Sequence, residues 1–400
     1  MQETPKGDRL HIGIFGRRNA GKSSLINALT NQDVALVSEH PGTTTDPVYK
    51  AMEILPIGPV MLVDTAGIDD TGDVGKLRIE RTKRVLNKID LALLVVDATV
   101  GWEKWELELY NQILGKGVPL IIVINKADLK VADQTHLPNN ITASIVAVSS
   151  YTGEGIDNLK DKLTQTVPDE FLEQKIIGDL LKPNDIVILV TPIDSAAPKG
   201  RLILPQVQVL RDILDSGATA MVCQEEQVAE AIANLKKPPR IVVTDSQAFE
   251  TVARQTPPEI MLTSFSILFA RHKGNLKALV EGAKTIKQLK PGDKVLISEG
   301  CTHHRQTDDI GKVKIPRWLN KTVGGQLEYH WTSGGGFPED LSSYKLIIHC
   351  GACMLNRREM LHRIQVAYGH KIPIVNYGVF IAYYNGILPR TLEPLLNIQK

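Results

Sequence analysis

The sequence predicts an α/β fold in three consecutive segments, and three observations lead to this prediction. Short apolar runs alternate with polar, helix-compatible stretches, a pattern typical of buried parallel strands joined by helices. Polar residues able to bind ligands come directly after several runs, where open α/β sheets place their sites. The 400 residues exceed what one hydrophobic core usually organises. We therefore expect one larger α/β domain followed by two smaller α/β domains.

The first segment, residues 1–172, contains five candidate strands, each followed by a loop and an amphipathic stretch. These apolar runs are residues 11–15, 60–64, 91–97, 120–125 and 145–148. They predict a parallel sheet whose carboxyl edge carries the binding residues.

The second and third segments also alternate short apolar runs with helix-compatible stretches. In residues 173–262, a linker-like Leu181-Lys-Pro-Asn-Asp stretch precedes the first candidate strand. This segment contains no cluster of reactive side chains, so we expect an interaction or dimerisation domain. Its candidate elements are strands 186–191, 218–222 and 241–244 and helices 204–214 and 226–235. In residues 263–400 the candidate strands are 294–299, 346–349 and 374–376. The glycine-containing stretch between the first two of these strands is expected to form loops.

The composition is that of a soluble globular protein, with 43% hydrophobic and 23% charged residues. The formal net charge is +1, so the composition shows no excess of positive charge that would favour binding to nucleic acid or to a membrane surface. The sequence has no apolar run of about 18 residues, and its start lacks the apolar core of a signal peptide. We expect a cytoplasmic protein with no nucleic-acid or membrane partner.

The stretch Gly16-Arg-Arg-Asn-Ala-Gly21-Lys22-Ser23 fits the phosphate-loop pattern G-x-x-x-x-G-K-[ST] between a strand and a helix. Backbone N–H groups of such a loop surround the β-phosphate, and the following helix adds the positive end of its dipole. Lys22 is expected to reach the β- and γ-phosphates, and the Ser23 hydroxyl to bind Mg²⁺. The expected phosphate-binding residues are Gly16, Asn19, Ala20, Gly21, Lys22, Ser23 and Ser24.

Two further segments complete the expected phosphate and magnesium chemistry. Asp64-Thr-Ala-Gly67 ends a strand, which places a carboxylate near the metal and a glycine N–H near the γ-phosphate. Between this motif and the phosphate loop, Thr44 is the preferred second magnesium hydroxyl, with Thr43 as the alternative. The expected catalytic residues are Lys22, Thr44, Asp64 and Gly67.

Asn125-Lys126-Ala-Asp128 ends another strand and predicts selection of guanine. The Asp128 carboxylate can accept hydrogen bonds from the guanine N1–H and exocyclic amine, which adenine cannot offer. Asn125 is expected to tether the base edge and the loop, and Ser149 and Ser150 to form a loop behind the base. The three ordered motifs together predict a P-loop domain that binds and hydrolyses GTP.

On these motifs, residues 11–160 resemble the small-GTPase superfamily, nearest to its Era- and MnmE-like branch. Ras-like proteins carry a water-orienting glutamine at the position of Ile68, so hydrolysis is expected to be slow or to depend on another group. In potassium-activated members of the branch, an asparagine of the phosphate loop helps to hold the cation. Asn19 stands at that position, and the resemblance therefore implies stimulation by K⁺.

Cysteines and histidines gather after two candidate strands of the last segment, as Cys301-Thr-His303-His304 and His349-Cys350-Gly-Ala-Cys353. If the two strands lie in one parallel sheet, both clusters meet at the same edge. Three cysteines and a histidine would satisfy a closed structural zinc site. Three cysteines would equally hold an iron–sulfur cluster with one iron open to another ligand. The spacing does not separate these readings, and unliganded cysteines or a redox dithiol also stay open.

A Cys-x-His followed about 45 residues later by His-Cys-x-x-Cys, behind an Era-like GTPase, resembles the HydF family, the GTPases among the maturases of FeFe hydrogenases. The resemblance implies a 4Fe-4S cluster bound by Cys301, Cys350 and Cys353. The fourth ligand is open among water, an exogenous ligand and four side chains: His303, His349, Asp308 and Asp309.

The same resemblance implies partners and a division of the chain. A HydF-like protein is a scaffold or carrier that receives a transient di-iron subcluster precursor, made with the radical-SAM maturases HydE and HydG, and delivers it to apo FeFe hydrogenase. Residues 1–172 would then bind GTP, residues 173–262 would form a homodimer, and residues 263–400 would bind the cluster. The alternative is a regulatory Era-like GTPase with a structural zinc domain that acts through RNA or ribosome contacts.

Overall fold

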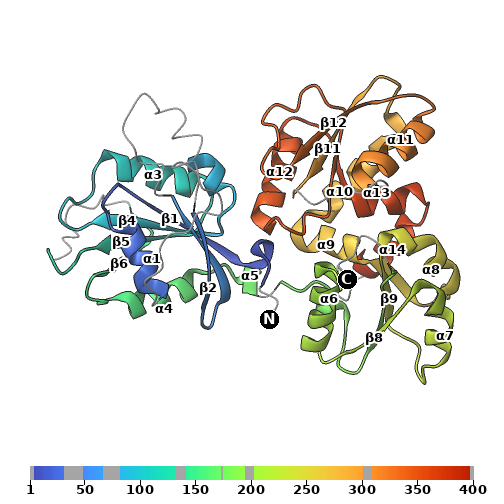
Figure 1. Ribbon diagram of the computed structural model, residues 1–400, viewed down its shortest axis with the longest axis horizontal. Helices are drawn as coiled ribbons and strands as arrows, with labels where there is room; N and C mark the ends of the chain where they lie inside the picture. Colours follow the sequence, from blue (N-terminus) through green and yellow to red (C-terminus); the bar gives the residue numbers. More distant parts are fainter. Residues whose placement is uncertain are drawn as a thin grey trace. The chain divides into compact units, whose positions relative to one another are not determined.

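The structure, a computed structural model, describes residues 4–30, 48–65, 82–130, 141–172, 174–193, 202–300 and 309–396. It consists of two compact units, Met1–Glu173 and Gln174–Lys400, which are described separately (Figure 1). Several predicted residues lie outside the described parts of the chain: Thr43, Thr44, Gly67, Ile68, Cys301, His303, His304 and Asp308.

The first unit contains a six-stranded sheet with the strand order β2-β3-β1-β4-β5-β6. The five strands expected from the sequence are present and parallel: β1 (Leu10–Gly16), β3 (Gly58–Asp64), β4 (Leu91–Asp97), β5 (Leu120–Asn125) and β6 (Ser144–Ala147). The edge strand β2 (Val48–Ile54) pairs antiparallel with β3 and was not expected. It mixes polar and apolar residues and is mostly half-exposed, so it forms no apolar run.

Helices cover both faces of this sheet, as Figure 1 shows. Helices α1 (Lys22–Thr30) and α4 (Ile156–Thr166) bury Leu25 and Leu159 against one face. Helix α3 (Lys104–Gly115) packs on the other face, and the short helices η1 (Lys6–Asp8) and α5 (Asp169–Leu172) stand near the ends of the unit's chain. The expected α/β fold of this domain is confirmed, with helices packed on both faces of the sheet.

The second unit begins with a parallel four-stranded sheet in the order β10-β9-β7-β8. Its strands are β7 (Ile186–Val190), β8 (Thr219–Cys223), β9 (Ile241–Thr244) and β10 (Met261–Ser264). Helix α6 (Leu204–Asp215) covers one face, and α7 (Val228–Ala233) and α8 (Phe249–Gln255) cover the other (Figure 1). The C-terminal helix α14 (Leu388–Leu396) packs along β10, where the Thr263 hydroxyl donates to the carbonyl of Thr391 at 3.0 Å.

A second parallel sheet of this unit has the order β12-β11-β13-β14. Its strands are β11 (Lys294–Glu299), β12 (Glu328–Ser333), β13 (Leu346–His349) and β14 (Ile374–Asn376), and β11 and β14 lie on either side of β13. The helices packed around it are α9 (Phe265–Lys273), α10 (Leu276–Lys284), α11 (Ile315–Val323), α12 (Arg357–Gly369) and α13 (Tyr377–Tyr384). Short helical turns complete the unit: η4 (Gly178–Leu180), η5 (Glu225–Gln227), η6 (Ser246–Ala248), η7 (Thr285–Gln288) and η8 (Ile310–Lys314).

The stretch between β11 and β13 corrects the expectation of loops, because it contains α11 and β12. Strand β12 reads Glu-Tyr-His-Trp-Thr-Ser and stands at the sheet edge, so its side chains are half-exposed and give no apolar run. Only its parallel pairing with β11 identifies it as a strand.

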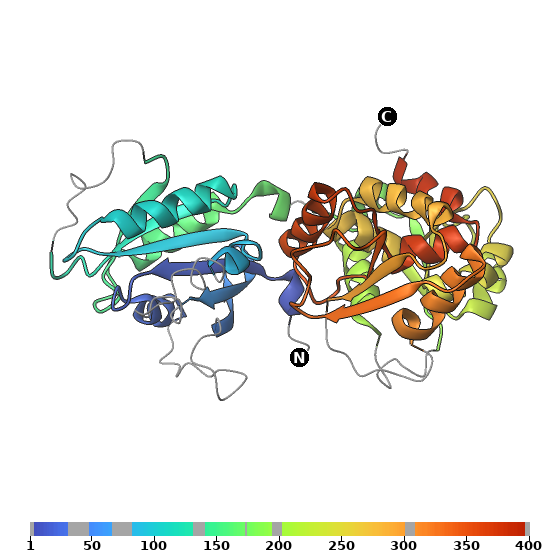
Figure 2. The same cartoon turned by 90° about the horizontal axis from the view of Figure 1, so that it is seen from above.

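The two sheets of the second unit share one hydrophobic core, which includes Val187 of β7 and Val295 of β11. Helix α9 leads from the end of β10 into the second sheet, and the Ser264 side chain caps its first turn by accepting from the N–H of Ile267. Figure 2 shows the two units from above. Among the described residues there is no helix whose length and apolar character would let it cross a membrane.

Candidate functional site

The phosphate loop between β1 and α1 depends on two glycines whose backbone other residues do not readily adopt. Gly16 has φ +154°, and a side chain there would lie 2.5 Å from the carbonyl oxygen of Val95 on the neighbouring strand. Gly21 has φ +87°, and its Cβ would lie 2.2 Å from Nδ2 of Asn125. Glycine at both positions therefore allows the loop to approach the sheet edge closely.

Asn125 joins the phosphate loop to the loop that follows β6. Its Nδ2 donates to the carbonyl of Ala20 at 2.9 Å. Its Oδ1 accepts from the backbone N–H and the hydroxyl of Ser150, at 3.0 and 2.8 Å. Ser149 is buried, and its hydroxyl accepts from the N–H of Thr152 at 3.1 Å. The structure thus brings together three segments that lie far apart in the sequence.

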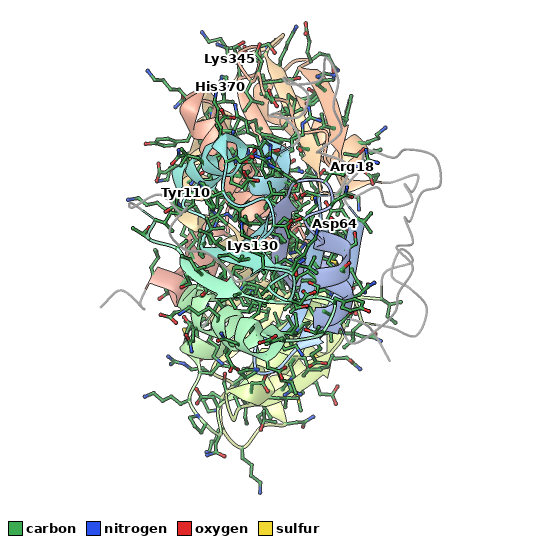
Figure 3. The ribbon with its side chains drawn as sticks, turned by 90° about the vertical axis from the view of Figure 1, so that its left-hand side faces the viewer. Arg18, Asp64, Tyr110, Lys130, Lys345 and His370 are labelled. Atoms are coloured by element: carbon green, nitrogen blue, oxygen red, sulfur yellow. The ribbon has the colours of Figure 1, made fainter. Side chains whose placement is uncertain are left out.

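Of the expected phosphate and magnesium side chains, the structure describes Lys22, Ser23 and Asp64. Nζ of the buried Lys22 donates to the carbonyls of Gly16 and Arg17, at 2.5 and 2.8 Å, within the loop itself. Figure 3 labels Asp64, the last residue of β3. The Ser23 hydroxyl lies 3.4 Å from Oδ2 of Asp64. A hydroxyl and a carboxylate facing each other are suitable oxygen ligands for Mg²⁺.

The remaining expected nucleotide residues are exposed or half-buried. Asn19, in the phosphate loop, has φ 64° and is exposed, and Ser24 is exposed in the first turn of α1. Asp128 is exposed beyond the end of β5, so its carboxylate is accessible to a base. Lys126 has φ 63°, and its Nζ pairs with Oδ2 of Asp97 at 2.6 Å. Burial acts to raise the pKa of Asp97, but hydrogen bonds from Lys126 and Thr99 hold it below its usual value.

One contact of the phosphate loop was not expected from the sequence. The guanidinium of Arg17 binds the carboxylates of Glu103 and Glu106 at the start of α3, with distances of 2.5 and 2.7 Å. Glu106 is buried and also accepts from the N–H of Glu103 at 3.0 Å. This ion-pair cluster fixes the loop to α3. Arg17 occupies an x position of the phosphate-loop pattern, so the sequence does not indicate its ion pairs with Glu103 and Glu106.

The cysteine motif lies at the carboxyl edge of the second sheet of the second unit. Strands β11 and β13 are parallel neighbours with Ser298 opposite His349, so the chain after each strand emerges at the same place. The Sγ of Cys350 accepts from the backbone N–H groups of Gly300 and Ala352, at 3.0 and 3.4 Å. The structure therefore brings the end of β11, which leads to Cys301, directly against the Cys-x-x-Cys turn.

The Cys350 residue is partly exposed, and its thiol lies close to Cys353 and Glu299. Burial raises the pKa of the Cys350 thiol to about 11, and the nearby Cys353 and Glu299 act in the same direction, against hydrogen bonds from Gly300 and Ala352. Ala352 holds the turn with φ 56°, and Cys353 is partly exposed. A thiol with this pKa is protonated at neutral pH, so a metal ion that bound to the sulfur would displace a proton.

His349 is fully enclosed, and both of its ring nitrogens bind protein groups. Nδ1 lies 2.9 Å from the carbonyl oxygen of Cys350, and Nε2 lies 3.0 Å from the Arg363 guanidinium. Burial and the charge of Arg363 lower the pKa of His349 to about 3, so the ring is neutral. The neutral ring therefore donates from Nδ1 and accepts at Nε2. Arg363 in turn binds Glu359 at 2.8 Å and the carbonyl of Gly334 at 2.7 Å.

A carboxylate that the sequence did not identify stands beside the cysteines. Glu299, the last residue of β11, is 4% exposed, and its Oε1 accepts from the hydroxyl of Tyr377 at 3.2 Å. Within the described part of the chain its Oε2 makes no hydrogen bond. Its position directly before Gly300 and Cys301 is the signal that could have identified it. Asp309, a predicted fourth ligand, caps η8 by accepting from the N–H of Lys312 at 2.8 Å.

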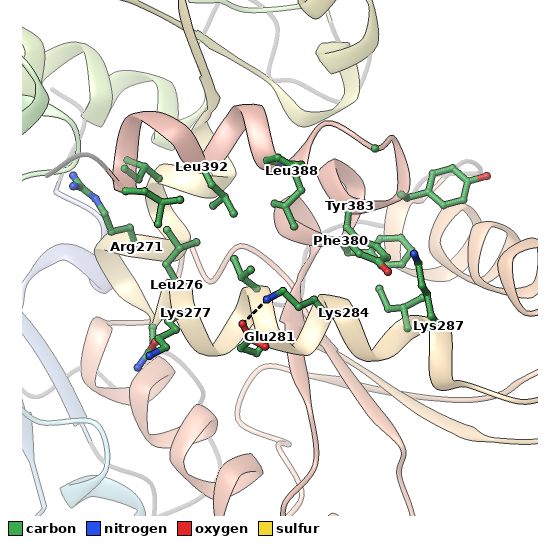
Figure 4. A pocket seen from close by; sticks show the side chains of 18 of the residues that line it. Arg271, Leu276, Lys277, Glu281, Lys284, Lys287, Phe380, Tyr383, Leu388 and Leu392 are labelled. Carbon is green, nitrogen blue, oxygen red and sulfur yellow. Dashed lines mark hydrogen bonds and ion pairs between the residues drawn. The ribbon is translucent and has the colours of Figure 1, made fainter. Parts of the chain in front are cut away.

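A separate cavity of about 1090 Å³ lies between α10, α13 and α14 (Figure 4). Apolar residues such as Leu276, Phe380 and Leu392 form much of its wall, and Lys284 pairs with Glu281 at its rim at 2.7 Å. The described cysteines do not line it. It is therefore distinct from the cysteine site.

Three family models match consecutive parts of the chain. A 50S ribosome-binding GTPase model matches residues 11–126, a hydrogen maturase F dimerization domain matches residues 176–274, and a hydrogen maturase F tetramerization domain matches residues 277–394. Together with the phosphate loop and the guanine motif, these matches define a P-loop GTPase, an enzyme that hydrolyses GTP, followed by two assembly domains. The chain belongs to the hydrogen maturase F (HydF) family.

Curated relatives match a smaller part of the chain. The tRNA modification GTPase MnmE of Synechococcus sp. (strain JA-3-3Ab) is 44% identical over 157 residues, which are 39% of this chain and 33% of the relative. MnmE of Trichormus variabilis is 42% identical over 162 residues, 40% of this chain and 34% of the relative. The chain thus spans about a third of the length of these relatives. The G domain of T. maritima FeoB matches at 25% identity and a TM-score of 0.33, over 40% of this chain and 99% of that domain.

Proposed function

We propose that this protein is a GTP-dependent scaffold and carrier in FeFe-hydrogenase maturation. It would hold a 4Fe-4S cluster at the cysteine site, receive a transient di-iron subcluster precursor made with HydE and HydG, and deliver it to apo-hydrogenase. The observation that carries the proposal is the convergence of the ends of β11 and β13, with the Cys350 sulfur accepting N–H groups from both segments.

The residues at this edge suit an iron–sulfur cluster. The proposed ligands are Cys350 and Cys353 with Cys301, which follows Gly300 beyond the described residues. Backbone N–H groups directed at a sulfur stabilise its thiolate form, as protein sites do for cluster ligands. When bound, the cluster would supply an iron with an exchangeable position, to which a precursor could attach.

We propose Glu299 as the fourth, exchangeable ligand in place of the imidazoles. Its carboxylate is buried beside Cys350, is held at Oε1 by Tyr377, and keeps Oε2 available within the described region. His349 instead uses both ring nitrogens within the protein and would orient the Cys350 carbonyl. His303, Asp308 and Asp309 stay as the competing assignments.

At the nucleotide site, we propose that Lys22 and the loop backbone bind the phosphates of GTP. Ser23, Thr44 and Asp64 would hold Mg²⁺, Gly67 would sense the γ-phosphate, and Asn19 would contribute to a K⁺ site. Asp128 would read guanine, supported by Asn125, Lys126 and the Ser149–Ser150 loop. The facing Ser23 and Asp64 oxygens support the magnesium assignment.

We further propose that the protein works in the cytoplasm as a homo-oligomer, with a dimer through residues 173–262 and the cluster domain in residues 263–400. The matched dimerization and tetramerization domains support self-association through the second unit. Size-exclusion chromatography with light scattering would measure the number of chains per assembly.

The function is tested by transfer of the precursor to apo-hydrogenase. Reconstituted protein loaded with a synthetic di-iron complex is mixed with apo-hydrogenase in the presence of GTP, GDP or a non-hydrolysable GTP analogue, and hydrogen evolution is measured. We expect activation by loaded wild-type protein and a rate that depends on the nucleotide. Equal activation by loaded protein and by the free complex would contradict a carrier role.

A further inference from the structure

The C-terminal end of α9 holds the cysteine turn through a buried lysine. Lys273, the last residue of the helix, is only 2% exposed. Its Nζ donates hydrogen bonds to the carbonyl oxygens of Cys353 and Leu355, both at 3.1 Å. The first carbonyl belongs to a proposed cluster ligand, and the second lies on the short chain that leads into α12.

A buried ammonium at this position needs an explanation. Moving such an ion out of water costs several kcal/mol, and the cost is recovered only when hydrogen bonds and nearby charge compensate it. A methionine would fill the same space without that cost. Lys273 therefore provides what an apolar residue could not: two directed hydrogen bonds to the turn and a positive charge next to the backbone of Cys353.

The same helix end also binds the first stretch of the second unit. Arg271 donates to both carboxylate oxygens of Asp179, at 2.8 and 2.7 Å, and to the carbonyl of Ile176 at 2.7 Å. The His272 carbonyl accepts from the side-chain amide of Gln174. Gln174 follows Glu173, the last residue of the GTPase unit, so these contacts reach the chain directly after that unit.

We propose that Lys273 is a positioning residue for the Cys350–Cys353 turn, and that the end of α9 links residues 174–179 to this turn. The inference rests on the proposed metal site. It adds that Lys273 fixes the cysteine turn, and that Arg271 connects this end of α9 to residues 174–179, which follow the GTPase unit. Displacing residues 174–179 would shift Arg271, and with it the helix end that presents Lys273 to the cysteine turn.

The first experiment measures thiol reactivity in the full-length, metal-free protein, so that it does not depend on cluster binding. Variants Lys273→Met, Lys273→Arg and Arg271→Met are treated with iodoacetamide, and labelling of individual cysteines is followed by mass spectrometry. Cys223, on β8 of the other sheet, is an internal control, and Lys284→Met removes an exposed lysine of α10 as a matched control.

We expect Lys273→Met to raise the labelling rate of Cys350 and Cys353 at least about fivefold, with Cys223 unchanged. Arg271→Met should produce a smaller rise at Cys353, Lys273→Arg should stay nearer to wild type than Lys273→Met, and Lys284→Met should have no effect. Unchanged labelling in Lys273→Met overturns the positioning role. A parallel rise at Cys223 also overturns it, because it shows general loosening of the unit. No rise in Arg271→Met overturns the link to residues 174–179.

The second experiment uses the reconstituted protein and measures the reduction potential of the cluster by an EPR-monitored titration. Removing a fixed positive charge disfavours the more negative, reduced cluster, so Lys273→Met should shift the potential to a more negative value. Lys273→Arg should restore most of the wild-type potential. An unchanged potential in Lys273→Met would show that the ammonium does not act on the cluster. Absence of any cluster in wild-type protein would count against the proposed function and leave the thiol-labelling result standing.

Discussion

The nucleotide site and the cysteine site both lie at the carboxyl edge of a parallel sheet, but different parts of the chain position their reactive groups. In the GTPase unit, glycines and backbone hydrogen bonds hold a loop of consecutive residues, and Asn125 ties it to the next loops. In the second unit, two strand ends meet, and buried charged side chains such as Lys273 and Arg363 hold them. The first site is thus largely encoded locally, whereas the second depends on tertiary packing.

The largest expected effect is the loss of one site's property in a variant that keeps the property of the other site. Lys22→Ala removes the ammonium from the phosphate loop and should lower GTP hydrolysis at least about 100-fold, while the iron content stays at the wild-type level. Cys353→Ala should abolish a stable cluster and leave GTP hydrolysis within about twofold. Phosphate release and iron quantification on both variants check this prediction. Loss of both properties in either variant would mean that the sites are not independent.

A smaller effect is expected from Gly21→Ala, which tests the close packing of the phosphate loop. The new Cβ would collide with Asn125, which three hydrogen bonds hold in place, and GTP affinity should fall about 30-fold or more. Gly101→Ala is the matched control, since Gly101 has φ +85° and no atom within 4 Å of the position that a Cβ would occupy. Binding of a fluorescent GTP analogue measures both. If GTP affinity fell equally in the two variants, the loss would come from backbone strain and not from the collision with Asn125.

Cluster loading should depend on pH in a way that nucleotide binding does not. Burial raises the pKa of Cys350 to about 11, so ligation at lower pH must first remove a proton. The apparent affinity for iron should therefore rise up to about tenfold per pH unit between pH 7 and pH 9. Iron titrations at several pH values, with GTP binding measured in parallel, test this. A flat profile would show that Cys350 is already a thiolate or is not a ligand.

The smallest effect is expected where the phosphate loop is held by charged side chains. Arg17→Met removes the ion pairs to Glu103 and Glu106 and leaves the buried Glu106 without this partner. The KM for GTP should rise about threefold to tenfold with little change in kcat, because the loop loses a support and keeps its phosphate-binding groups. Steady-state kinetics of GTP hydrolysis measure KM and kcat separately. A fall in kcat alone would place Arg17 in the catalytic step instead.

The same contrast explains what could be predicted from the sequence. The phosphate loop and the Asn-Lys-x-Asp motif are contiguous and need a fixed spacing, so they identified the fold of the first unit and its nucleotide. Strand β12 was missed because its half-exposed edge position requires no apolar run. Glu299 and Lys273 were missed because a carboxylate before glycine and a lysine at a helix end are usually solvated, and only the packing shows that they are buried.

The central claim, a GTPase that carries an iron–sulfur cluster on Cys301, Cys350 and Cys353, is tested most directly by anaerobic reconstitution followed by metal analysis and visible absorption. A brown protein with about four iron and four sulfide per chain is the predicted result, and Cys353→Ala should lose them. A colourless protein that binds about one zinc per chain would contradict the claim and favour a structural zinc domain.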